Sequence, residues 1–146
     1  MTEDDGRELA ALPKWGEPNS DWSQDRPNTL TNGFGVLDVD GKTIKGLHVE
    51  FEVFTSPTLG LTKFVFSLMR YELGRVERAF QLEINGRPGL RRTDHNYSHE
   101  HYGEAKFKAD ESWAGAGFVD AVKRLCDAVN LTLTVEMPDY ESFKLR

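Results

Sequence analysis

The sequence has few of the features that mark secreted, membrane-spanning or disulfide-rich proteins. Its single cysteine, Cys126, excludes a disulfide within the chain, and a lone thiol is typical of a reducing compartment. The longest apolar run, from Leu9 to Leu12, is far shorter than the ~20 residues that span a bilayer. The opening segment, Met1 to Asp5, lacks the positive charge that begins a signal peptide. We therefore expect a cytoplasmic protein that does not enter a membrane.

Positive charge is also scarce. The chain has 18 Lys and Arg against 24 Asp and Glu, which gives a net charge of −6. Because nucleic-acid-binding domains are usually basic, this balance argues against broad binding to duplexes. The charge balance does not exclude a small basic cleft on an acidic body, since the electric field at a site depends on the local arrangement of charge. The length of 146 residues, with 38% hydrophobic and 29% charged, is typical of one globular domain.

Alternating apolar and polar residues predict most of the fold. Leu47, Val49, Phe51 and Val53 alternate with polar residues, as in a strand buried on one face. Similar patterns predict strands over residues 34–39, 44–54, 62–71, 76–84 and 131–137. Apolar residues between 117 and 129 recur at helical spacing instead. We therefore expect an α+β fold: a mostly antiparallel β-sheet of about five strands with one main helix packed on a face. The expected core includes Phe51, Phe66, Leu82, Leu125 and Leu133.

Residues 1–31 lack this periodicity because proline, glycine and asparagine interrupt them. We interpret them as an extended N-terminal arm and residues 32–146 as a single α+β domain. Trp15 and Trp22 are exceptions within the arm, and we expect both indoles to dock on the domain.

Three of the four histidines, His95, His99 and His101, lie within seven residues of each other. In an extended segment, His99 and His101 project from the same face, roughly 6–7 Å apart. Such a pair suits metal-independent cleavage of RNA, because one imidazole can accept the 2′-hydroxyl proton while the other protonates the leaving oxygen. In this hypothesis Arg91 or Arg92 binds the phosphate charge. Tyr97 or Tyr102 would stack on a base.

Two other interpretations of the histidines stay open. His-x-His is a common half of a metal site, which Asp94, Glu100 or Glu104 could complete. No third ligand stands at a diagnostic spacing, so we expect no structural zinc and no cofactor. The segment could also be a polar surface loop whose histidines have no chemical role.

Longer motifs resemble known families. The stretch from Phe80 to Pro88, then Ser98 to Tyr102, Trp113 and a helix to Cys126, resembles a family of small uncharacterised bacterial and phage proteins with a His-x-His core. This resemblance covers residues 34–130. Arg92-Thr93-Asp94 together with His99 to Glu104 is also similar to the core of TumE-like toxins of toxin–antitoxin pairs. That similarity implies an RNase-type growth inhibitor with Arg92, Asp94, His99 and His101 as catalytic residues.

Two hypotheses for the function follow. The first is a toxin-like enzyme that acts on RNA and is held in check by a cognate antitoxin. The second is a non-catalytic acidic module that binds a protein, such as an antitoxin, an immunity protein or a phage anti-defence inhibitor of an enzyme. The histidine and arginine cluster favours the first, and the net charge of −6 favours the second. The oligomeric state stays open.

Overall fold

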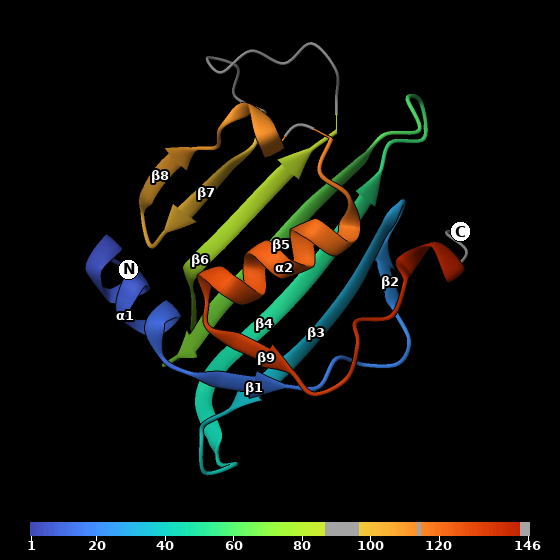
Figure 1. Ribbon diagram of the computed structural model, residues 1–146. Coiled ribbons are helices and arrows are strands. Elements are labelled where there is room, and N and C mark those ends of the chain that lie inside the picture. Colours follow the sequence, from blue (N-terminus) through green and yellow to red (C-terminus); the bar gives the residue numbers. More distant parts are fainter. Residues whose placement is uncertain (87–96, 114, 144–146) are drawn as a thin grey trace.

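The computed structural model describes residues 1–86, 97–113 and 115–143, which form a large sheet with two α-helices (Figure 1). In chain order the elements are α1 (Glu3–Ala11), β1 (Lys14–Gly16), β2 (Ser23–Arg26), β3 (Thr29–Leu37), β4 (Thr43–Thr55), β5 (Thr62–Glu72), β6 (Arg75–Asn85), β7 (His99–Tyr102), β8 (Ala105–Lys108), the 3₁₀ turn η1 (Glu111–Trp113), α2 (Phe118–Ala128), β9 (Leu131–Leu133) and the 3₁₀ turn η2 (Tyr140–Ser142). Helix α2 crosses one face of the sheet (Figure 1). The α+β class is confirmed, but among the described residues the sheet has nine strands rather than about five.

The sheet is an antiparallel meander that ends in one parallel pair. Its strands lie in the order β8-β7-β6-β5-β4-β3-β1-β9, and β2 pairs with β3 beside this path. Only the β1–β9 pair is parallel among the described strands. The four long strands β3 to β6 form the centre, and the short strands β7 and β8 extend the sheet beyond β6, at the end opposite β9.

Alternation along the long strands decides which face is closed by α2. In β4 the odd-numbered residues from Leu47 to Val53 are buried, and in β5 the same is true of Phe64, Phe66 and Leu68. Phe51 and Phe66 are register partners whose ring centroids lie 4.7 Å apart. Leu125 of α2 is buried in the same core, which confirms the predicted packing of the helix on the sheet.

The last strand is shorter than predicted. β9 ends at Leu133 and the chain bends at Thr134, whereas alternation continues to residue 137. Its partner β1 ends at Gly16, whose carbonyl accepts a hydrogen bond from the Thr134 N–H at 2.9 Å. Beyond that bond no described strand remains for the chain to pair with, and Leu133 is only half-buried.

Residues 1–31, expected to be extended, contain α1 as well as β1 and β2. The Thr2 hydroxyl caps α1 by accepting a hydrogen bond from the Asp5 N–H, and three acidic residues occupy the first turn. Gly6 lets α1 approach the sheet, because a Cβ at this position would lie 2.5 Å from the Ala79 carbonyl oxygen. Trp22 is buried and donates to the Pro138 carbonyl, as docking on the domain requires. Neither α1 nor α2 has the length and apolar character to cross a membrane.

A fully buried lysine joins the ends of both helices. The Lys14 Nζ donates to the carbonyl oxygens of Ala10 at 3.0 Å and Val129 at 2.7 Å, and also to that of Leu12. These carbonyls lie at the C-terminal ends of α1 and α2, where a cation is favoured. Burial lowers the pKa of Lys14 to about 8, so the ammonium still predominates at pH 7.

Candidate functional site

The predicted site residues divide between described and undescribed parts of the chain. Arg91, Arg92 and Asp94 lie outside the described residues, as does His95. His99 and His101 lie on β7, next to Glu83 and Gln81 of β6 in the sheet register. They share the face of the sheet opposite α2, and their ring centroids are 4.9 Å apart. We call these two residues the histidine pair.

His99 is held rigidly and is only 7% exposed. Its Nδ1 lies 2.7 Å from the carbonyl oxygen of Tyr97 and 3.7 Å from a carboxylate oxygen of Glu83. Because a carbonyl can only accept, Nδ1 carries the proton and the neutral ring keeps Nε2 as an acceptor. Burial lowers the pKa of His99 more than the contacts with Tyr97 and Glu83 raise it, so the neutral form is favoured.

His101 is also neutral at pH 7. Burial is the main cause that lowers its pKa to about 4, and the nearby Arg78, His99 and Lys106 add to the effect. Its Nδ1 is buried and has no hydrogen-bond partner within the part of the chain described. A group with this pKa is protonated in only about one molecule in a thousand at pH 7. The histidine pair therefore lacks an imidazolium that could act as the general acid.

Polar side chains surround the pair on the same face. The register aligns Glu50, Ser67, Gln81, His101 and Lys106 in one row across β4 to β8. The Gln81 amide donates to the Ser67 hydroxyl at 2.9 Å and accepts from Arg78 at 3.2 Å. A hollow of about 180 Å³ on this face is lined by Gln81 and residues of β4 and β5, but by neither imidazole. The pair is thus embedded in the sheet rather than set in a cleft.

The two tyrosines do not lie where they could stack a base against the histidines. Tyr102 points to the opposite face, where its ring packs on Phe80 at 4.9 Å and the Arg7 guanidinium lies 4.0 Å above it. Tyr97 is buried. Stacking on a nucleobase needs an accessible ring face, so these positions do not favour the predicted role.

Metal and thiol chemistry find no support in the described residues. Across residues 1–86, 97–113 and 115–143, no three His, Cys, Asp or Glu side chains are grouped so as to hold a metal ion. Burial, with Asp127 adding to it, raises the pKa of Cys126 to about 11, so this cysteine stays a thiol at pH 7. It packs against the hydrophobic core as a small apolar side chain.

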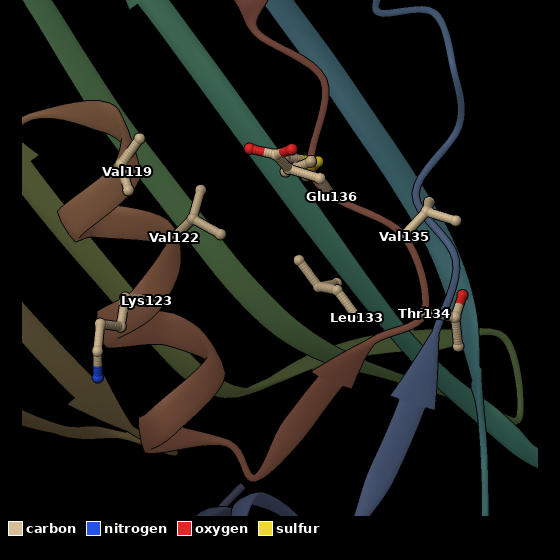
Figure 2. Close-up of a pocket in the computed structure, with 8 residues that line it drawn as sticks. Val119, Val122, Lys123, Leu133, Thr134, Val135 and Glu136 are labelled. Carbon is tan, nitrogen blue, oxygen red and sulfur yellow. The ribbon is translucent and has the colours of Figure 1, made fainter.

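A second candidate site lies between α2 and the chain that follows β9, and the sequence did not predict it. A groove of about 400 Å³ is lined by Val119, Val122 and Lys123 of α2 and by residues 133–137. Figure 2 shows that the Leu133 and Glu136 side chains extend toward α2, whereas the Val135 side chain points away from the helix. Val119 is 80% exposed and Val135 is 48% exposed. We call this the α2–β9 groove. Helical spacing places the three α2 residues on one face, but only the fold brings residues 133–137 beside them.

The groove continues into an acidic hollow. Val135 and Glu136 also line a space of about 620 Å³ with Glu17, Pro18 and their neighbours, which we call the acidic hollow. Glu17 and Glu136 are exposed, and neither forms an ion pair with a residue that the structure describes. In contrast, Lys123 pairs with Asp127 at 2.8 Å. The combined surface is apolar at one end and carries uncompensated negative charge at the other.

No protein-family model, curated protein or solved structure matches the chain. The resemblance to TumE-like toxins and to the His-x-His family therefore stays a hypothesis.

Proposed function

We propose that this chain is a non-catalytic module that binds a basic protein. The observation that carries the proposal is the exposed Val119, which lines a groove with Val122 and Leu133, and this groove shares Glu136 with the acidic hollow. Apolar side chains grouped in a groove with a polar rim are typical of protein-interaction sites. The net charge of −6 agrees with a basic partner.

The charges at the groove suggest the kind of partner. Glu17 and Glu136 gain a favourable interaction only when a cation approaches them, because no described residue neutralises them. Enzymes that act on nucleic acids present basic surfaces to the phosphate backbone. An acidic module that covers such a surface would inhibit the enzyme, which is the second function expected from the sequence.

Titration of the purified chain against the purified products of its neighbouring genes tests this function. We expect one product to bind, with an affinity that falls as salt is added. Glu136→Lys should weaken the complex by about tenfold or more, because it places a cation opposite a basic partner. Glu8→Lys is the matched control, since Glu8 is an exposed acid on α1, away from the groove. Growth inhibition by the chain alone, with no protein bound, would refute the proposal.

Action on RNA is the second candidate, and one observation favours it. Three cations lie close enough to the histidine pair to lower the pKa of one or both rings: Arg78, Lys106 and Lys108. A bound phosphate would offset these cations and raise both pKa values, which would make an imidazolium more accessible during a reaction. The toxin-like hypothesis therefore depends on substrate-induced protonation.

The structure changes how the RNA hypothesis is tested. Replacing both histidines is a poor test, because His99 is buried and bonded to Tyr97, so its removal would also disturb packing. His101→Gln with Lys106→Gln is the cleaner pair of changes, because both side chains are more exposed. If the chain cleaves single-stranded RNA, His101→Gln should slow cleavage by about 100-fold or more. Lys106→Gln should slow cleavage by a smaller factor. If the rate of RNA cleavage is unchanged in His101→Gln, the histidine pair is not the catalytic site.

A further inference from the structure

The outer edge of β9 is an unpaired sheet edge. β9 is the last strand of the sheet path, and it pairs only with β1 among the described strands. The hydrogen bonds from the Lys14 N–H to the Asn130 carbonyl and from the Thr134 N–H to the Gly16 carbonyl fix its orientation. In a parallel pair, alternate residues bond to the neighbouring strand. The peptide groups of Leu131 and Leu133 therefore point away from β1.

This free edge lies on the same side as the α2–β9 groove. Figure 2 shows β1 on one side of β9 and α2 on the other, with the Leu133 side chain between β9 and the helix. Leu133 also lines the groove with Val119 and Val122. Main-chain donors and acceptors that pair with no described strand thus lie next to an exposed apolar surface, a combination that can pair with another chain.

We propose that the groove receives an extended segment of the partner protein, which adds to the sheet as a strand beside β9. The segment places apolar side chains against Val119 and Val122 and a Lys or Arg side chain near Glu136. This inference rests on the protein-binding function proposed above and specifies the partner's chemistry. Strand addition gains affinity from main-chain hydrogen bonds and specificity from pockets for alternate side chains.

The dimensions of the site suit such a segment. Residues two apart on a strand lie about 6.5 Å apart on the same face, so one strand can place an apolar residue in the groove and a basic residue toward the acidic hollow. The groove of about 400 Å³ is within the range of sites that hold a few side chains. A helical segment would satisfy its own peptide groups and leave those of Leu133 unpaired.

The probe is a phage library of random linear peptides, panned in parallel on the wild-type full chain and on Val119→Asp. Asp at the second position of α2 suits the helix N-terminus, so this variant should keep its fold. We expect wild type alone to enrich peptides that combine alternating apolar residues with Lys or Arg. A synthetic consensus peptide should bind Val119→Asp and Glu136→Lys at least about tenfold more weakly than wild type.

Two controls separate this surface from the rest of the molecule. Val39→Asp changes an equally apolar residue, 75% exposed, in the β3–β4 turn, and Glu8→Lys makes the same charge reversal on α1. Both should change peptide affinity by less than about twofold, as expected of changes outside an interface. Methylation of alternate peptide amides should abolish binding in one register and be tolerated in the other, because only alternate amides face β9. Binding should also slow hydrogen exchange at the Leu133 amide.

Several results would overturn the proposal. It fails if wild type enriches no peptide over Val119→Asp, if both methylation registers weaken binding equally, or if the Leu133 amide is unaffected. If these tests fail while an intact protein partner still binds and responds to Glu136→Lys, strand addition is wrong and the protein-binding function stands. If the intact partner also fails to bind, both are wrong.

Discussion

The two faces of the sheet are built by the same strands but differ in how completely their side chains are buried. On the face covered by α2, Phe51, Phe66 and Leu82 are fully buried. On the opposite, open face the neighbouring Glu50 and Gln81 are half-buried and polar. Period-two alternation therefore assigns the closed face to packing and leaves the open face to hydrogen bonds and charge.

This difference also decides the chemical state of the polar side chains on the open face. Its polar groups bond to one another, as Gln81 does to Ser67, and its histidine pair is neutral because neighbouring strands remove water from the imidazoles. The candidate binding surface lies at the end of the sheet, between α2 and β9. No described strand lies beyond β9 there.

The largest expected effect is on the closed face. Leu82→Ala should lower the free energy of unfolding by about 3 kcal/mol, because it removes a fully buried side chain and leaves a cavity. Val65→Ala, on the open face of the adjacent strand, is the matched control and should cost about 1 kcal/mol. Urea denaturation measures both. Equal losses would mean that the two faces contribute alike to stability.

The next effect concerns Lys14, a fully buried charge that joins the ends of α1 and α2. Lys14→Met keeps the length of the side chain but leaves the Ala10 and Val129 carbonyl oxygens without their donor. We expect a loss of about 2 kcal/mol, the scale of unsatisfied buried acceptors. Thermal unfolding followed by circular dichroism would detect it. A Met variant as stable as wild type would show that the ammonium contributes no net stability.

A smaller effect is expected from the hydrogen bonds of the open face. Ser67→Ala removes the acceptor for the Gln81 amide and should cost about 1 kcal/mol. Thr at this position keeps a hydroxyl, so Ser67→Thr should lose less. If Ser67→Ala is the more stable of the two in urea, the polar row contributes nothing to the fold.

Replacing His101 should have the smallest effect on stability at neutral pH. The effect should grow as the pH is lowered. The His101 pKa of about 4 lies below the ordinary 6.5, so the unfolded chain takes up a proton between these values while the folded chain does not. The stability contributed by the neutral ring is complete above pH 6.5 and is lost as the pH falls toward 4. His101→Gln should therefore lose less stability than wild type between pH 7 and pH 4. Parallel urea curves at each pH compare the two, and identical pH dependence would contradict the buried, neutral state.

Alternation and helical spacing were sufficient to predict the elements that build the core. The strands containing Phe51, Phe66 and Leu82 and the helix containing Leu125 are confirmed, because each carries enough apolar residues to show its period. The short strands β1, β2 and β8 were missed, since three or four residues are too few for a period to be read, whereas β7 was considered only as an extended segment. α1 was missed although Thr2 and the acids after it are an N-terminal signal, because Gly6 interrupts the pattern.

The candidate sites were less accessible to sequence reasoning. The spacing of His99 and His101 correctly placed both on one face. Their burial depends on the neighbouring strands β6 and β8, which the spacing does not contain. The α2–β9 groove could not be predicted at all, because it requires the fold to bring Val119 and Leu133 together.

The contact between β1 and the C-terminal part of the chain has a consequence for the order of folding. Lys14 and Val129, joined by a hydrogen bond, are 115 positions apart in the sequence. Forming a contact between such distant residues costs loop-closure entropy before the contact contributes any stabilising energy. The hairpins from β3 to β6 join adjacent segments, so their loops are short and this cost is smaller. The meander should therefore form first, and the β1–β9 pair, with the edge next to the groove, should form last. During synthesis, β1 cannot pair with β9 until residues 131–133 have left the ribosome.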